Sequence, residues 1–149
     1  MLARRPLTVA EVRTRLAAKQ FDDTAIELAV DELLDEALLD DADLAYQYIV
    51  VRAERMLHGE QRLVRDLVAR GVENATAEAA WRRALEEGEV DDEALLRRAV
   101  ERRLSRERQF DDGARRRVYN ALLRAGFAPS EIGAELRRQT DGTTQDESP

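Results

Sequence analysis

Three short segments of this chain repeat one pattern, at residues 16–21, 67–72 and 122–127. Each begins with a leucine, ends five positions later with another apolar residue, and holds a basic residue between the two. Each is also followed by the start signal of a new helix. The segments are spaced by 51 and then 55 residues, so the sequence predicts a small tandem array of helical units.

Start signals divide the chain into eight predicted helices. Residues that can cap a helix N-terminus come directly before stripes of apolar residues with helical spacing. Four of these signals are pairs of aspartates, which we interpret as caps and not as metal ligands. The predicted helices begin at or near Thr8, Asp22, Asp40, Gly59, Glu73, Asp91, Asp111 and Pro129.

Grouped by the repeated pattern, the helices form a set of two followed by two sets of three. A shift of 51 residues places Leu44 on Leu95 and Arg52 on Arg103. The predicted fold is therefore all-α, an elongated, curved array of tandem three-helix repeats whose first repeat is truncated to about two helices. We place the first, partial repeat at residues 1–39, the second at 40–90, the third at 91–140, and a disordered polar tail at 141–149.

The residue inventory argues against an enzyme, a metal site or a cofactor. The chain has no cysteine and a single histidine, His58, which is expected to be solvated in a turn. It contains no glycine-rich phosphate loop and no nucleophile elbow. Its apolar runs are shorter than the roughly 20 residues of a membrane span, and its N-terminus lacks the apolar core of a signal peptide. We expect a cytoplasmic monomer that does not associate with membranes.

Positive charge is concentrated in one part of an acidic chain. The formal net charge is −7, which disfavours a protein that holds DNA by charge alone. Residues 97–124 nevertheless contain ten basic and four acidic side chains. One interpretation is a solvated helix face with local ion pairs such as Arg103 with Glu107. The other is a partner with negative charge, either nucleic acid or an acidic protein groove, and charge alone leaves both open.

The order and spacing of several motifs resemble those of RecX proteins, the bacterial regulators of the RecA recombinase. The resemblance covers roughly residues 8–138, almost the whole chain. One departure is Gln20, which stands where the first repeat usually has glycine, so that turn must accommodate a side chain. The residues that carry the resemblance are 39–45, Tyr48, Arg52, Arg55, Gly59, Arg62, 67–72, 122–127, Ile132 and Leu136.

The resemblance implies a regulatory function without catalysis. RecX proteins bind RecA–DNA filaments in or near the filament groove, and they inhibit the ATPase, strand-exchange and coprotease activities of RecA. The implied partners are the RecA filament and the single- or double-stranded DNA within it. Two alternatives stay open: a helical protein that binds DNA without RecA, and an interaction scaffold for an unrelated protein. The expected contact residues are Arg52, Arg55, Arg62, Arg65, Arg102, Arg103, Arg115 and Arg116.

Overall fold

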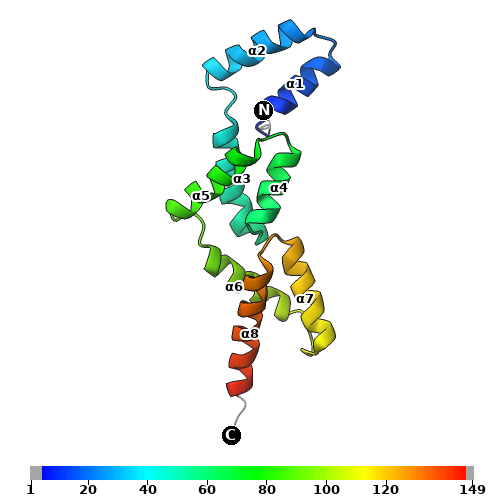
Figure 1. The fold of residues 1–149 in the computed structure, drawn as a ribbon, viewed down its shortest axis with the longest axis vertical. Coiled ribbons are helices and arrows are strands. Elements are labelled where there is room, and N and C mark those ends of the chain that lie inside the picture. Colours follow the sequence, from blue (N-terminus) through cyan, green and yellow to red (C-terminus); the bar gives the residue numbers. More distant parts are fainter. Residues whose placement is uncertain (1–4, 147–149) are drawn as a thin grey trace.

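The computed structural model of the protein describes residues 5–146, with side chains described for residues 5–141. The described residues form eight α-helices and no strand, as the sequence predicted (Figure 1). The helices are α1 (Val9–Ala18), α2 (Asp23–Asp35), α3 (Asp41–Met56), α4 (Glu60–Ala69), α5 (Asn74–Glu86), α6 (Asp92–Leu104), α7 (Asp112–Arg124) and α8 (Pro129–Asp146).

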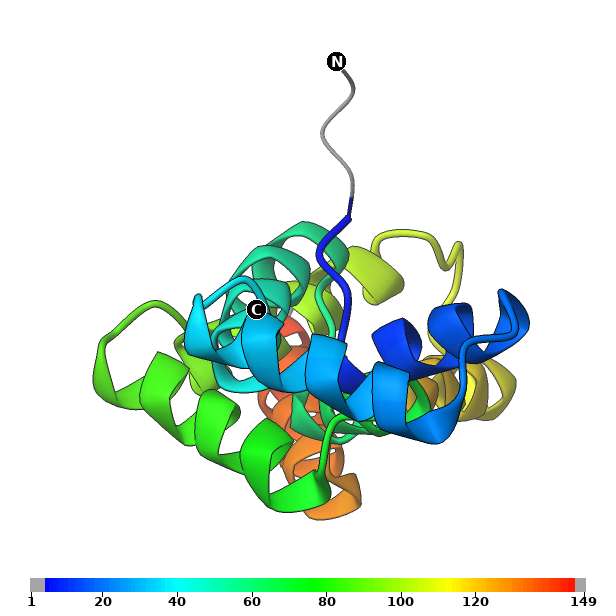
Figure 2. The same ribbon diagram turned by 90° about the horizontal axis from the view of Figure 1, so that it is seen from above.

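The helices follow one another down the long axis of an elongated molecule. The pair α1 and α2 lies at one end, the three helices α3 to α5 lie in the middle, and α6 to α8 lie at the other end (Figure 1). Seen along that axis, α5 and α7 project on opposite sides of the stack (Figure 2). This arrangement is the predicted array of repeats, with two helices in the described part of the first unit.

Five of the described helices, α1, α2, α3, α6 and α7, start at side-chain caps that the sequence singled out. Thr8 forms a capping box, in which its hydroxyl accepts from the backbone N–H of Glu11 and the Glu11 carboxylate accepts from the backbone N–H of Thr8. The first aspartate of each pair accepts a hydrogen bond from the backbone N–H three residues later, at 2.8 to 3.2 Å. The aspartate pairs are therefore helix caps. These aspartates are Asp22, Asp40, Asp91 and Asp111.

The last helix is longer than predicted. The sequence placed the end of the third repeat at residue 140, whereas α8 continues to Asp146. The hydroxyl of Thr140 donates to the carbonyl of Leu136 at 2.6 Å, a bond that is compatible with continued helix. The predicted tail therefore begins too early for residues 141–146, and residues 147–149 lie outside the described part of the chain.

The three repeated segments form the same helix-ending turn. In each, the final apolar residue donates its backbone N–H to the carbonyl of the leucine five positions earlier, at 3.0 to 3.3 Å, as in a Schellman motif. The residue before it has a positive φ, of 68° at Gln20, 96° at Gly71 and 100° at Gly126. Gln20 thus adopts the conformation that glycine adopts in the other two repeats, as expected.

The core is continuous through the second and third units and separate in the first. Helices α3 to α8 contribute to one apolar cluster around the fully buried Trp81. A smaller cluster is formed by Ile26 and Val30 of α2 with Leu39, and side chains of α1 pack against it. Within the repeated turn, Val72 and Phe127 are buried, but Phe21 is 53% exposed. The three residues share one position of the repeat, which favours packing for all of them, and this prediction is wrong for Phe21. The described residues place no helix over its turn, whereas Gly59 lies against Phe127.

Candidate functional site

Neighbouring units are joined in the same way at both junctions of the array. The N-terminus of one helix sits on the Schellman turn of the following unit. At the first junction, the Thr8 hydroxyl donates to the carbonyl of Arg70 at 2.8 Å. At the second, which lies 51 to 55 residues further along, the Gly59 N–H donates to the carbonyl of Ala125 at 2.8 Å. The same structural positions therefore meet at both junctions, and their side chains can be compared directly.

The first junction contains its own counter-ion. Glu11 on α1 accepts two hydrogen bonds from the Arg70 guanidinium, at 2.9 and 3.2 Å, and a third from Arg5 at 3.2 Å. The hydrogen bonds from Arg70 outweigh the effect of burial and hold the pKa of Glu11 at about 2, against an ordinary value of 4.5. A carboxylate of the first unit thus pairs with Arg70, the arginine that bridges these two units.

Replacing Glu11 with glutamine should remove an acid-sensitive part of the stability. Because the folded pKa is depressed, the ionised carboxylate stabilises the fold above pH 4.5, and this contribution disappears as the pH falls to about 2. At neutral pH we expect E11Q to lower the free energy of unfolding by roughly 2 kcal/mol, the worth of a shielded charge-assisted pair. Urea denaturation at a series of pH values should show the two proteins converging below pH 4.5. A constant difference at every pH would contradict this role.

The second junction holds a cavity of about 370 Å³ where the C-terminal ends of α3, α6 and α7 approach α4. Six guanidinium groups line it, and no carboxylate of the described residues does. Its apolar lining comes from short or aliphatic side chains such as Ala99 and Leu122. The cavity is therefore suited to an anion. The six arginines are Arg55, Arg62, Arg102, Arg103, Arg106 and Arg124.

The fold itself offsets only part of this charge. Each helix C-terminus carries roughly −0.5 of an elementary charge, so the three that end here supply about −1.5 against six positive groups. Arg62 pairs with Asp66 at 3.6 Å, and among the described residues the other five form no ion pair. Burial, followed by repulsion from Arg106, Arg124 and Arg102, lowers the pKa of Arg103. An excess of positive charge is left in the cavity.

His58 lies in this cavity and is not the solvated side chain that the sequence suggested. It is half-buried, and its Nδ1 has no hydrogen-bond partner among the described residues. Burial and the nearby positive charge of Arg62 lower its pKa, and Asp66 opposes them. The imidazole is therefore neutral at physiological pH and adds no further positive charge to the site.

The structure brings half of the predicted contact residues together and separates the rest. Arg55, Arg62, Arg102 and Arg103 line the cavity. Arg52 stacks on the ring of Tyr48, 5.0 Å from its centroid, beside the first junction. The others line two shallower hollows: Arg65 lies between α4 and α5, and Arg115 and Arg116 lie between α7 and α8.

Two members of the cavity were not among the predicted contact residues. Arg124 is the third residue of the last repeated segment, and Arg106 follows α6 in the region of high positive charge. Only the distribution of charge could have indicated them. Within the described ranges, no three or more histidine, cysteine, aspartate or glutamate side chains gather as possible metal ligands. The described helices also include none with the length and hydropathy of a membrane span.

Comparison with known proteins agrees with the sequence resemblance. Residues 1–33 match the family described as RecX, first three-helix domain. The regulatory protein RecX of Corynebacterium efficiens is 33% identical over 146 residues, which cover 93% of this chain and 67% of the relative. The chain belongs to the RecX family. A further RecX regulatory protein, from Halorhodospira halophila, is 31% identical over 134 residues, which cover 90% of this chain and 80% of that relative.

A solved structure supports the same fold. The crystal structure of RecX from Lactobacillus salivarius superposes with a TM-score of 0.70, at 20% identity, over 89% of this chain and 84% of that protein. The array of helical repeats is thus shared with a RecX protein whose sequence is distant. The relatives are named regulatory proteins, so this chain is a RecX-type regulator.

Proposed function

We propose that this protein binds RecA–DNA filaments and inhibits the ATPase, recombinase and coprotease activities of RecA. The observation that carries the proposal is the cavity at the second junction, where five arginines that form no ion pair with any described residue face one opening in a RecX fold. Guanidinium groups form bidentate hydrogen bonds with phosphates and carboxylates. The filament presents both chemistries, on its DNA and on its protein surface.

The shape and charge of the chain favour a partner that offers many weak contacts. An elongated array exposes a long surface, and the predicted contact residues extend along it from Arg52 in α3 to Arg116 in α7. The net charge of −7 disfavours a protein that holds DNA by charge alone. The protein would act in the cytoplasm as a monomer and without catalysis, by occupying the filament.

The decisive measurement is ATP hydrolysis by RecA on single-stranded DNA as this protein is titrated. We expect the rate to fall in a saturable manner as the protein occupies the filament. The same titration with a second DNA-dependent ATPase that is unrelated to RecA controls for sequestration of the DNA. Unchanged RecA hydrolysis at saturating protein would refute the proposal, and equal inhibition of both enzymes would refute its dependence on RecA.

Direct DNA binding without RecA is the second candidate, because the same cavity can accept a backbone phosphate. It requires binding to single- or double-stranded DNA in the absence of RecA. The logarithm of the binding constant should then fall steeply with the logarithm of salt concentration, by about one unit for each phosphate contact. An anisotropy titration with a labelled oligonucleotide at several salt concentrations separates this candidate from the first.

A further inference from the structure

The two junctions of the array differ in charge at one equivalent position. Glu11 is the third residue of α1, and the register of 51 residues places Arg62, the third residue of α4, on it. Both side chains lie beside the turn of the following unit: Glu11 bonds to Arg70, and Arg62 donates to the carbonyl of Arg124 at 3.2 Å. The carboxylate that pairs with Arg70 at the first junction is therefore replaced by another arginine at the second.

One surrounding position also gains a positive charge at the second junction, and another becomes polar without adding charge. Leu7 and Val51 line a groove at the first junction, and the register places His58 and Arg102 on them at the second. The groove at the first junction thus combines apolar side chains with arginines and with carboxylates that offset their charge, those of Asp40 and Asp43. The second collects guanidinium groups from α3, α4, α6 and α7 around one opening, and the carboxylate that pairs with Arg62 lies one turn further along the same helix.

We propose that the cavity of the second junction binds a phosphate group, which takes the place that the Glu11 carboxylate has at the first. A phosphate carries up to two negative charges and accepts several hydrogen bonds, so it can join arginines of the second unit to those of the third. The bound group would link Arg55 of α3 to Arg102 and Arg103 of α6. The volume of about 370 Å³ is within the range of small-ligand sites.

Inorganic pyrophosphate is the probe that tests this site in the full-length protein. Titrated at constant ionic strength, it should raise the melting temperature by a few degrees and saturate, because it binds only the folded junction. An equivalent concentration of chloride should not do so. A thermal shift that is absent, or that chloride reproduces, would overturn the proposal, and a shift that requires molar concentrations would indicate an adventitious ion only.

Amino-acid substitutions test whether pyrophosphate binds in the cavity of the second junction. R102Q/R106Q removes two charges from exposed side chains of the cavity and should weaken pyrophosphate binding about tenfold or more in calorimetry. R62E places a carboxylate in the cavity, as at the first junction, and should weaken pyrophosphate binding to a similar extent. R82E makes the same charge change on α5, outside the cavity, and should bind almost as wild type. Equal losses in R62E and R82E would contradict a local site.

The phosphate can come from a free small anion or from a nucleic-acid backbone. Competition between pyrophosphate and a short single-stranded oligonucleotide distinguishes the sources: mutual displacement indicates the backbone, and independent binding indicates a free anion. The inference concerns the site used by the proposed function but does not require RecA. Wild-type protein that inhibits RecA and ignores pyrophosphate would refute this inference alone. Protein that binds pyrophosphate without affecting RecA would refute the proposed function alone.

Discussion

Replacing Gly126 with alanine should destabilise the protein by about 3 kcal/mol or more. Two effects add at this residue. Its φ of 100° is unfavourable for any residue with a Cβ. A Cβ there would also lie 2.5 Å from the Cβ and 2.9 Å from the Cα of Arg62, and closer still to its backbone nitrogen. Helix α4 would have to move away from the turn.

The same movement would break the second junction. The N–H groups of Gly59 and Gln61 donate to the carbonyls of Ala125 and Gly126 at 2.8 and 3.2 Å, and both bonds depend on this close approach. Urea denaturation followed by circular dichroism measures the loss of stability. We also expect pyrophosphate to lose its stabilising effect in G126A, because the arginines of the two units would separate.

Gly88 provides a matched control for the two effects. It has a similar left-handed conformation, with a φ of 74°, but a Cβ there would meet no atom within 4 Å. G88A should therefore show the conformational penalty alone, about 1 kcal/mol. If G88A and G126A lose the same stability, the contact between the units contributes nothing measurable, and the described packing of the second junction is wrong.

The parts of the fold that the sequence predicted are those fixed within a few residues. A cap needs only a carboxylate or hydroxyl and the N–H three residues later, as at Asp91. The Schellman turns are equally local, so the repeat could be recognised from the pattern that residues 16–21, 67–72 and 122–127 share. The end of α8 could not, because Gly142 and the polar residues around it favour a helix end, whereas α8 continues to Asp146.

The composition of the cavity depends on how the units pack and could not be read from the spacing of residues. Arg52 and Arg103 occupy equivalent positions of the repeat, yet Arg52 stacks on Tyr48 and Arg103 faces other arginines. Equivalence in sequence thus fixed the backbone and left the electrostatic surroundings undetermined. The spacing of residues does not show which side chains meet at each junction. At the equivalent position, the first junction has the negative Glu11 and the second has the positive Arg62.

Reversing the charge of Arg102 and Arg103 should weaken inhibition of RecA about tenfold or more in apparent affinity, if the cavity contacts the filament. Both side chains line the cavity from the last turn of α6. The R102E/R103E variant would place two carboxylates beside Arg106 and Arg124. These carboxylates would form ion pairs with the two arginines and so exclude an external anion. The measurement is RecA ATP hydrolysis on single-stranded DNA across a titration of the variant.

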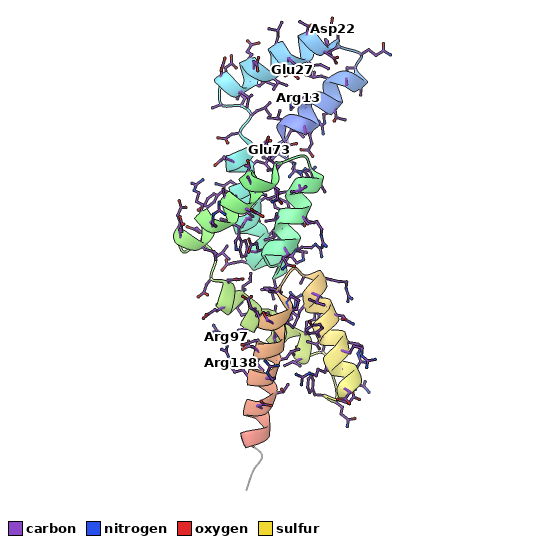
Figure 3. The ribbon with its side chains drawn as sticks, in the orientation of Figure 1. Arg13, Asp22, Glu27, Glu73, Arg97 and Arg138 are labelled. Atoms are coloured by element: carbon purple, nitrogen blue, oxygen red, sulfur yellow. The ribbon has the colours of Figure 1, made fainter. Side chains whose placement is uncertain are left out.

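The stability of the R102E/R103E variant shows whether these two arginines contact the partner or hold the fold together. Burial and, after it, repulsion from neighbouring arginines lower the pKa of Arg103, so replacing two of these arginines with glutamate should leave the free energy of unfolding unchanged or higher. The control R82E/R97E makes the same change of charge outside the cavity, with Arg97 on the opposite side of the third unit from α7 (Figure 3). Inhibition by this control should remain close to that of wild type. A folded R102E/R103E protein that inhibits RecA as well as wild type would remove the cavity from the interface with the filament.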